Sequence, residues 1–294
     1  MISFLEILIP KNLNEALSLL VERKNNCRII AGGTDVVPGL QQGSNRFANS
    51  DLLIDINRIP EIKSITRARE KISIGGAETF SDILQNQIVQ EELPLLWKAC
   101  STIGSMQIRN RATIAGNFVN NAPCADTVPA LLVYNATVEI ESLSSKKEIS
   151  IGEFLTGPYK TKLNKDEIVT RINVPIPSKE FRGDFYKLGR RRAVAISRIT
   201  LAVLTKTQNH MIDEIRIASG AVTPIGIRFS DLEKLAKGKY ADDKFLKLLS
   251  QKLGEQILNV TGLRWSSEYK LPVVQQMFYS LILRNVVTKN LLHF

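Results

Sequence analysis

Two short segments carry residue types that can bind phosphate through the backbone. The first is AGGTDVVP, residues 31–38, at the end of the apolar run CRIIA. Gly32 and Gly33 have no bulky Cβ and let backbone N–H groups approach an anion, while Thr34 adds a hydroxyl donor. Asp35 would repel a phosphate that it faced, so we expect its carboxylate to cap the following turn. Taken alone, this segment is more typical of an ordinary turn.

A second segment of the same kind lies about 80 residues further along the chain, within TIAGNFVNNAPCAD, residues 113–126. It supplies small residues, one hydroxyl and three side-chain amides: Thr113, Gly116, Asn117, Asn120 and Asn121. Two such loops could hold the two phosphates of a dinucleotide from opposite sides, and Asp126 could accept hydrogen bonds from sugar or ribityl hydroxyls. Neither segment reads GxGxxG or GxxxxGKS/T, which excludes Rossmann and P-loop sites. The pair predicts that Gly33 and Gly116 converge in space.

The sequence offers no side-chain set for catalysis or for metal binding. Its cysteines are Cys27, Cys100 and Cys124, and its histidines are His210 and His293. No CxxC, HxxE or HExxH arrangement can be formed from them, so neither an iron–sulfur cluster nor a structural zinc site is expected on this chain. Three separate cysteines are typical of a reducing cytoplasm, and we interpret Cys124 as an inert small side chain. Redox chemistry would therefore come from an organic cofactor or from a partner.

The net charge of +10 raises the question of nucleic acid binding. The basic residues are spread along the chain, with one dense group at Arg190, Arg191 and Arg192, and the aromatic residues are not interleaved with them. A solvated basic surface is the simplest interpretation, followed by an anionic ligand or an acidic partner. No apolar run is long enough to span a bilayer and no leader pattern opens the sequence. We predict a cytoplasmic protein that binds neither nucleic acid nor membranes.

The elements expected around these segments are of mixed type. Helical spacing predicts helices over residues 13–24 and 91–103 and a further helix that begins at Thr79 or Ser81. Strands are predicted over residues 27–31, 51–56, 71–76 and 136–142. The prolines of VPIPS, residues 174–178, mark a linker. Strands are predicted after it over 184–190, 197–206 and 213–222, and helices from about residue 230 onward, as in a separate α+β domain.

Five segments occur in an order and spacing that resemble the FAD-binding medium subunit of the molybdenum hydroxylases. They are AGGTDVVP, LLIDINRIPEIKSI, IGGAETFSDI, IGSMQIRNRATIAGN and NAPCADTVPALL. The resemblance continues through FYKLGRRRAVAIS and SGAVTPIGIR to RWSSEYKLPVV, so it covers nearly the full chain. Xanthine dehydrogenase, carbon monoxide dehydrogenase and nicotinate dehydrogenase contain subunits of this family.

The resemblance implies an α+β fold with two domains. Residues 1–175 would form a two-subdomain FAD-binding domain of the vanillyl-alcohol-oxidase or PCMH-like type, with subdomains of about 1–58 and 59–175. Residues 179–294 would form an α+β C-terminal flavoprotein domain with three strands followed by helices. The cysteine-rich insertion that some relatives carry for a further cluster is missing from this sequence.

The resemblance also implies which residues contact FAD. Asp126 would lie near the sugar chain, Ile168 would pack on the isoalloxazine, and Lys187 would lie near the polar edge of the flavin with Tyr186 beside it. A cation at that edge stabilises the reduced flavin and raises its reduction potential. The two phosphate cradles would consist of Arg28, Ile29, Ile30, Ala31, Gly32, Gly33, Thr34 and Asp35, and of Thr113, Ile114, Ala115, Gly116 and Asn117.

The implied function is electron transfer within a larger oxidoreductase. FAD on this chain would take electrons from an iron–sulfur small subunit with 2Fe–2S clusters and pass them to NAD⁺ or another acceptor. Substrate would be hydroxylated at a molybdenum–pterin site on a large subunit, and the assembly would be a dimer of heterotrimers. Three alternatives stay open: a stand-alone FAD oxidoreductase, a basic anion-binding module without enzymatic activity, and a structural spacer.

Overall fold

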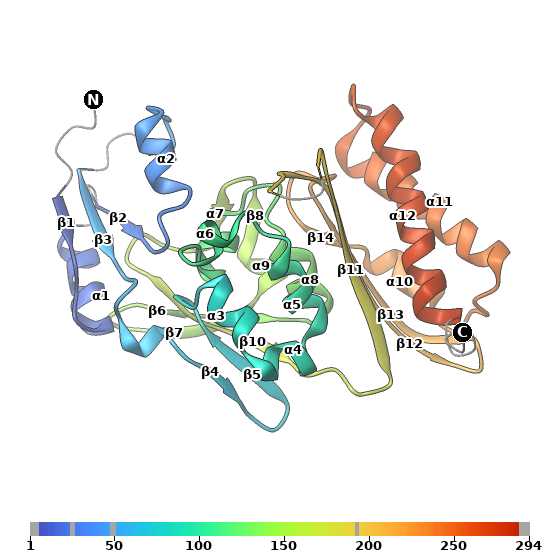
Figure 1. Ribbon diagram of the computed structural model, residues 1–294, viewed down its shortest axis with the longest axis horizontal. Coiled ribbons are helices and arrows are strands. Elements are labelled where there is room, and N and C mark those ends of the chain that lie inside the picture. Colours follow the sequence, from blue (N-terminus) through green and yellow to red (C-terminus); the bar gives the residue numbers. More distant parts are fainter. Residues whose placement is uncertain (1–5, 24–26, 48–50, 192–193, 288–294) are drawn as a thin grey trace.

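The computed structural model describes residues 6–23, 27–47, 51–191 and 194–287, so Arg192 and His293 lie outside the described residues. Three parts lie side by side in chain order: a small blue part, a central cyan and green part, and an orange and red part (Figure 1). This mixed architecture confirms the predicted α+β fold class. None of the helices in the described ranges is both long and apolar enough to cross a bilayer.

The first part is a parallel three-stranded sheet with one helix packed on it. The strand order is β1 (Glu6–Leu8), β3 (Leu52–Asp55) and β2 (Cys27–Ile30), with helices α1 (Leu13–Glu22) and α2 (Val36–Gln41). Helix α1 begins where the Asn12 side chain accepts a hydrogen bond from Glu15 N at 2.9 Å. It buries Ala16, Leu17 and Leu20, which the spacing of apolar residues predicts.

The second part contains a five-stranded antiparallel sheet. The strand order is β4 (Ile65–Arg67), β5 (Lys71–Gly75), β10 (Ile168–Pro175), β6 (Thr137–Glu141) and β7 (Lys146–Ser150). The strands β8 (Leu155–Gly157) and β9 (Lys160–Thr161) form a separate hairpin, and the 3₁₀ turn η1 (Pro60–Ile62) precedes β4 in the chain. Its helices are α3 (Phe80–Gln85), α4 (Gln87–Glu92), α5 (Pro94–Ser101), α6 (Met106–Arg109), α7 (Ile114–Asn120), α8 (Thr127–Val133) and α9 (Ile151–Phe154).

Of two helices predicted in this part, one is present as expected and the other is divided in two. Helix α3 begins at Thr79, whose hydroxyl accepts from Asp82 N while the Asp82 carboxylate accepts from Thr79 N. The single helix expected over residues 91–103 was wrong: the chain forms α4 and α5, which meet at Leu93. Pro94 is the first residue of α5, because proline has no N–H to continue a preceding helix but fits the first helical position.

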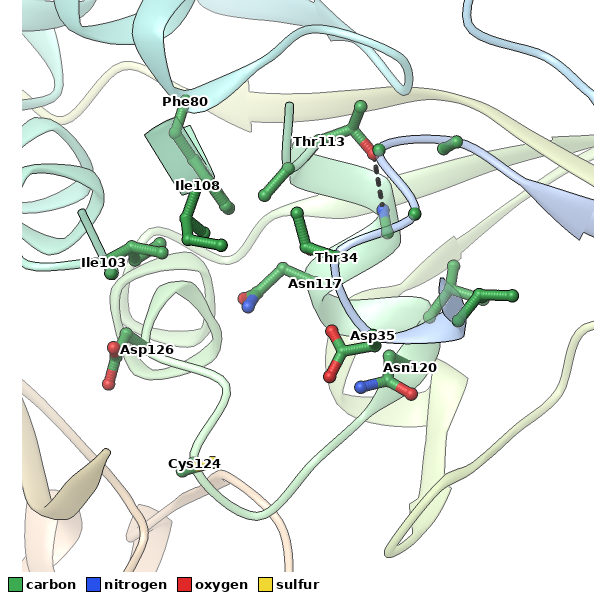
Figure 2. A pocket seen from close by; sticks show the side chains of 18 of the residues that line it. Thr34, Asp35, Phe80, Ile103, Ile108, Thr113, Asn117, Asn120, Cys124 and Asp126 are labelled. Carbon is green, nitrogen blue, oxygen red and sulfur yellow. Dashed lines mark hydrogen bonds between the residues drawn. The ribbon is translucent and has the colours of Figure 1, made fainter. Parts of the chain in front are cut away.

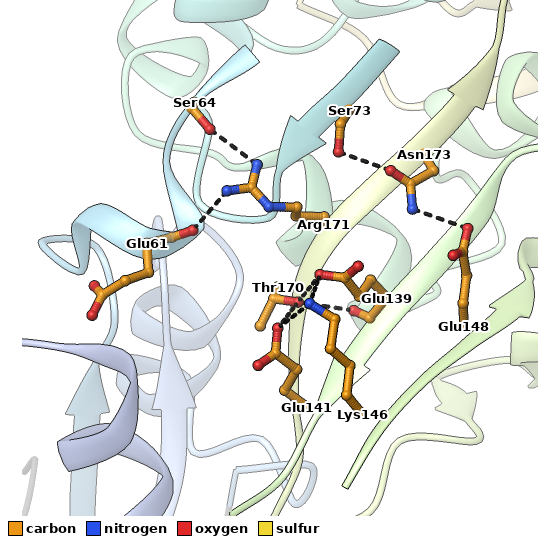
Figure 3. Close-up of polar contacts among 10 residues, drawn as sticks. All are labelled: Glu61, Ser64, Ser73, Glu139, Glu141, Lys146, Glu148, Thr170, Arg171 and Asn173. Atoms are coloured by element: carbon orange, nitrogen blue, oxygen red, sulfur yellow. Dashed lines mark hydrogen bonds and ion pairs between the residues drawn. The ribbon is translucent and has the colours of Figure 1, made fainter. Parts of the chain in front are cut away.

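Polar contacts on β10 tie the central sheet to the segment that leaves the first subdomain (Figure 3). Arg171 donates from Nη1 to Ser64 Oγ at 3.0 Å and from Nη2 to the carbonyl oxygen of Glu61 at 3.1 Å. Beside this contact, Lys146 Nζ lies 2.8 Å from the Glu139 carboxylate. The first two contacts hold the segment that follows the first subdomain against the central sheet.

The C-terminal part is a four-stranded antiparallel sheet covered by helices. The strand order is β11 (Phe181–Gly189), β12 (Ser197–Gln208), β13 (Met211–Gly220) and β14 (Ile227–Arg228), followed by α10 (Ser230–Ala236), α11 (Asp243–Thr261) and α12 (Ser267–Val287). Strands followed by helices were predicted, and the short β14 adds a fourth strand to the three expected. The sheet lies between these helices and α5 and α8 of the central part.

Strand β11 presents different residues to its two faces, because successive side chains of a strand alternate. Phe185 is buried in the core shared with the central part, whereas Leu188 packs on the core beneath the C-terminal helices. Lys187 lies on the same face as Phe185 and therefore points toward the central part. Tyr186 lies on the opposite face, where 40% of its surface is exposed.

Candidate functional site

The glycine segment after β2 is an open turn packed directly on the second subdomain. Gly33 has a φ of +72°, a backbone region that favours glycine. A Cβ on Gly32 would lie 2.1 Å from the carbonyl oxygen of Arg111, so only glycine permits this contact. Within the described part of the chain, the backbone N–H groups of residues 32–35 donate to no protein acceptor. They are therefore available to an anion.

The second segment is not a loop, as expected from the sequence, but the first turn of α7. Thr113 caps this helix: its Oγ1 accepts from Gly116 N at 3.2 Å (Figure 2). Ala115 N donates to the carbonyl oxygen of Gly76 at 3.2 Å. Burial of Ile114 and Phe118, four residues apart, supplies the helical spacing that the glycine and asparagines obscured. In the described structure, the N–H groups of residues 114–117 thus have protein acceptors, whereas those of residues 32–35 have none.

Both segments line one cavity of about 500 Å³ between the subdomains and the C-terminal sheet. Gly33 and Gly116 are both on its wall, as the sequence predicted. Side chains from α2, α6, α7 and the segment before α8 surround the same space (Figure 2). The expected residues that line it are Arg28, Ile29, Ala31, Gly32, Gly33, Thr34, Asp35, Thr113, Gly116, Asn117, Asp126 and Lys187.

Five expected contact residues do not line the cavity. Ile114 and Ala115 are buried, at 0% and 7% exposure, and Ile30 lies between two residues that line the cavity without lining it itself. Ile168 is 1% exposed and packs in the core of the first subdomain. Tyr186 points away from the cavity because it lies on the other face of β11.

At one end of the cavity, Asp126 and Lys187 form a buried ion pair. Lys187 Nζ lies 2.6 Å from Asp126 Oδ2 and also donates to the carbonyl oxygen of Thr102 at 2.9 Å. The two side chains are 10% and 8% exposed, and Ser197 Oγ donates to the other Asp126 oxygen. Burial raises the pKa of Asp126, and the Lys187 charge and the two hydrogen bonds oppose that rise.

Asp35 does not cap α2, contrary to the expectation from the sequence. It occupies the N-cap position with a φ of −108° and a ψ of −39°, and its side chain makes no capping hydrogen bond. A capping side chain needs an extended backbone, which Asp35 lacks. The carboxylate is directed toward the cavity near Asn120 (Figure 2). Burial raises the pKa of Asp35, and the charge of Arg46 opposes that rise.

Sequence reasoning missed a group of apolar, aromatic and basic residues on the cavity wall. The adjacent residues Arg46 and Phe47 were the local signal for part of this group. A cation and an aromatic ring attract each other, and together they can form a surface on which a ligand stacks. Cys124 also lines the wall, and burial and the nearby Asp126 raise the pKa of its thiol, in keeping with an unreactive side chain. The missed residues are Val36, Arg46, Phe47, Phe80, Ile103, Gly104, Ile108, Ala112, Val119, Cys124, Tyr159, Val194, Ala195, Ile196 and Ser197.

Residues 194–196, just before β12, line part of the cavity. Val194 has a φ of +50°, which is unusual for a β-branched residue and indicates a backbone held in place by its surroundings. Arg191 supplies one such constraint, since its Nε and Nη2 donate to the carbonyl oxygen of Val194 at 3.0 and 2.6 Å. Arg191 therefore holds the backbone at Val194.

A cavity between two subdomains, with free backbone N–H groups along it and a buried lysine at one end, defines a protein that binds a dinucleotide cofactor. Comparison with known proteins specifies the cofactor. Residues 3–177 match the family model described as the FAD binding domain in molybdopterin dehydrogenase, and residues 184–285 match the CO dehydrogenase flavoprotein C-terminal domain.

Individual relatives agree with the family models. The glyceraldehyde dehydrogenase medium chain of Sulfolobus acidocaldarius is 34% identical over 265 residues, 90% of this chain and 92% of that protein. The xanthine dehydrogenase FAD-binding subunit of Escherichia coli O157:H7 is 33% identical over 267 residues, 90% of each. The solved carbon monoxide dehydrogenase of Hydrogenophaga pseudoflava that lacks the Mo-pyranopterin moiety matches with a TM-score of 0.90 at 26% identity, over 98% of both chains.

The chain belongs to the family of FAD-binding subunits of the molybdenum hydroxylases. It is an oxidoreductase subunit, and FAD is its cofactor. The resemblance found in the sequence is thereby confirmed.

Proposed function

We propose that this chain carries FAD as the electron-transfer subunit of a molybdenum-containing hydroxylase or dehydrogenase. The observation that carries the proposal is the cavity, in which free N–H groups of one glycine segment lie between the buried pair Lys187–Asp126 and a cluster of basic residues. Bound FAD would accept electron pairs and release them singly or as hydride. The protein itself then needs no nucleophile or general base.

The cavity wall suggests how the chain would hold FAD. The N–H groups of residues 32–35 and the Thr34 hydroxyl would bind the diphosphate, for which the turn geometry at Gly33 is suited. Asn117 already accepts a hydrogen bond from Thr127 at 2.7 Å, which fixes the orientation of its amide at the cavity. Asp126 would accept hydrogen bonds from ribityl hydroxyls. We retain the other sequence-derived contacts that line the cavity as parts of this proposal.

Among the described residues that line the cavity, Lys187 is the lysine, and its ammonium group is buried. Its charge would stabilise the reduced flavin and raise the reduction potential, because a nearby cation favours added negative charge. Thr102 and Asp126 hold the ammonium group in position. The ion pair moderates the effective charge, so the increase in potential would be smaller than that from an isolated lysine.

The remaining elements of the proposal concern the complex. The electron donor would be an iron–sulfur small subunit, the substrate would react on a molybdenum–pterin large subunit, and the acceptor would be NAD⁺ or another oxidant. The relatives that match are described as medium chains or subunits, which supports a multi-subunit assembly. A cytoplasmic dimer of heterotrimers, with domains at 1–175 and 179–294, completes it.

Purification from the native host with a tag on this chain tests the proposal. We expect a yellow complex in which mass spectrometry identifies two partner subunits, acid extraction releases FAD, and metal analysis finds molybdenum and iron. Two outcomes would contradict it. A yellow chain that turns over substrate alone would indicate a stand-alone oxidoreductase, and a colourless chain with salt-sensitive binding to nucleic acid would indicate an anion-binding module.

A further inference from the structure

The connection between α11 and α12 presents large apolar side chains to solvent. Leu263 is 86% exposed and Trp265 is 90% exposed, and Tyr269 in the first turn of α12 is also exposed. Folding normally buries most of the surface of a tryptophan, and exposed apolar side chains that lie together mark interaction sites. We call Leu263, Trp265 and Tyr269 the apolar tip.

The backbone that carries the apolar tip is held in place. Helix α11 ends at Gly262, whose φ of +64° lies in a region that favours glycine. Arg264 N donates to Ser267 Oγ at 2.9 Å, and Ser267 N donates back to the carbonyl oxygen of Arg264 at 2.9 Å. A partner that binds the tip would therefore have little backbone to order, which favours binding.

Three cations lie beside the apolar tip: Arg264 within the connection, Lys270 in the first turn of α12, and Arg198 in β12. Burial lowers the pKa of Lys270, and the charges of Arg198 and Arg264 lower it further, as expected for cations near one another. Arg264 Nε and Lys270 Nζ donate to backbone carbonyl oxygens, at 3.3 and 3.0 Å. Residues 260–270 contain one carboxylate, that of Glu268. This surface therefore carries a net positive charge.

The charged surface adjoins the cofactor cavity. Ile196 lines the cavity two residues before Arg198 and is 79% exposed, so apolar surface continues from the cavity toward the cations. Lys270 Nζ donates to the carbonyl oxygen of Ala221 at 3.0 Å. Ala221 N in turn donates at 2.8 Å to the carbonyl oxygen of Pro123, in the segment before α8 that forms part of the cavity wall. A protein bound at the apolar tip would thus lie beside the proposed FAD.

We propose that an acidic one-electron carrier protein of the ferredoxin type docks on the apolar tip and its three cations and is the electron acceptor. This inference rests on the proposed function, and it specifies the acceptor that the proposed function leaves open. Interfaces with electron carriers are small, and a charged rim around an apolar centre speeds their encounter. The cations select an acidic partner, and the net charge of +10 attracts it over a longer range. A second copy of this chain would be repelled.

The electron balance separates this acceptor from NAD⁺. Reduced FAD would lose two electrons and release two protons to water, and each of two carrier molecules would take one electron at its iron–sulfur cluster. NAD⁺ instead takes a hydride directly from the flavin and has to enter the cavity. The outer surface at Trp265 therefore matters for a carrier protein and not for NAD⁺.

Binding to the complete complex tests the proposal. The complex would be co-expressed with its partner subunits, and its affinity for oxidised ferredoxin from the native host would be measured by calorimetry. Between about 20 and about 200 mM salt, the affinity is expected to fall about 10-fold, because salt screens exposed charges. Trp265→Ala should weaken binding about 30-fold at both salt concentrations, the loss typical of a central tryptophan. Arg264→Gln should weaken it mainly at low salt.

Electron transfer provides a second measurement on the same variants. The complex would be reduced with dithionite and mixed rapidly with oxidised ferredoxin or with the dye dichlorophenolindophenol. Trp265→Ala should slow the reaction with ferredoxin at subsaturating carrier and leave the reaction with the small dye unchanged. Trp265→Phe keeps an aromatic ring and should recover most of the ferredoxin rate.

Controls separate docking from folding and from assembly. Ile7→Ala removes an exposed apolar side chain from β1, in the first subdomain, and should change neither measurement. Trp265 is almost fully exposed, so its removal should leave thermal unfolding unchanged. Size-exclusion chromatography of each variant shows whether the partner subunits are retained.

The outcomes discriminate between the inference and the function on which it rests. If Trp265→Ala releases a partner subunit, the apolar tip is a subunit interface, and the carrier inference is wrong while the FAD function stands. Ferredoxin binding that depends on neither salt nor Trp265, or a reduced complex that reacts with the dye and not with ferredoxin, would have the same consequence. A complex without FAD would overturn both.

Discussion

Lys187 Nζ lies 2.6 Å from Asp126 Oδ2, and this ion pair crosses from the C-terminal sheet to the segment that precedes α8. The two residues are 61 positions apart in sequence and are buried together at the cavity wall. The contact has two consequences: it positions an ammonium group at the cofactor cavity, and it ties the C-terminal domain to the FAD-binding domain.

Removing one partner of this pair should be more damaging than removing both. Lys187→Met leaves the Asp126 carboxylate buried without its counter-charge, which typically costs about 3–5 kcal/mol. Asp126→Asn leaves the ammonium group unpaired and should cost a similar amount. The double variant should be less destabilised than either single variant, and therefore much less than their sum. Urea unfolding of the apo forms measures these costs, and simple additivity would show that the two groups do not interact.

Gly32→Ala should prevent the glycine segment from packing on the second subdomain. The new Cβ would lie 2.1 Å from the carbonyl oxygen of Arg111, where backbone has to move to make room. We expect a cost of about 3 kcal/mol, at the upper end for overpacking, and loss of bound FAD. The readouts are unfolding midpoint and flavin content.

A matched glycine provides the control for this variant. Gly152 lies in α9, and a Cβ there would meet its nearest heavy atom at 3.6 Å, an ordinary contact distance. Gly152→Ala should be neutral or stabilising by up to about 1 kcal/mol, because alanine favours helix. Equal behaviour of the two variants would refute the packing argument.

Cys124 should react slowly with alkylating reagents, and bound FAD should protect it. Burial and the neighbouring carboxylate of Asp126 raise the pKa of its thiol. Since thiolate is the reactive form, the rate at Cys124 should still be rising with pH above about 8.5, where an ordinary exposed cysteine approaches its plateau. Iodoacetamide labelling between pH 7 and 10, quantified by peptide mass spectrometry, measures this dependence.

The other two cysteines calibrate the labelling experiment. Cys100 is fully buried, with a strongly raised pKa, and should stay unlabelled until the protein unfolds. Cys27 is partly exposed and lies outside the cavity, so FAD should not change its rate. Equal labelling of Cys124 with and without FAD would place the cofactor elsewhere.

Asn121→Gly should weaken the support of the β8–β9 turn without straining the backbone. Glycine accepts the φ of +44°, but the variant loses the hydrogen bonds to Gly157 and Lys160. At about 1 kcal/mol for each bond, a loss of about 2 kcal/mol is expected. Asn209→Gly, at a φ of +50° in the β12–β13 turn, should cost almost nothing. Denaturant midpoints compare them, and a similar loss in both would exclude a role for the Asn121 side chain.

Local sequence patterns were sufficient for much of the fold. The apolar spacing of α1 and the strand runs of β2 and β3 are local signals, and the structure contains each element close to its predicted bounds. The first proline of the predicted linker, Pro175, is the last residue of β10, and Pro177 follows the strand. Where two local signals conflicted, the prediction failed. Pro94 divided an apparent helix, and the glycine and asparagines of 113–121 hid the helical spacing of α7.

The chemical groups of the site were also present in the sequence. Gly32 and Gly33 let the backbone approach an anion closely, and Lys187 provides a positive charge. What these residues contact was decided by the tertiary structure. The approach of Gly32 to Arg111, the alternation of β11 that turns Lys187 inward and Tyr186 outward, and the stacking of Arg46 on Tyr159 all join distant segments. Sequence order specifies which groups are available, whereas long-range packing of strands and helices determines which of them share a cavity.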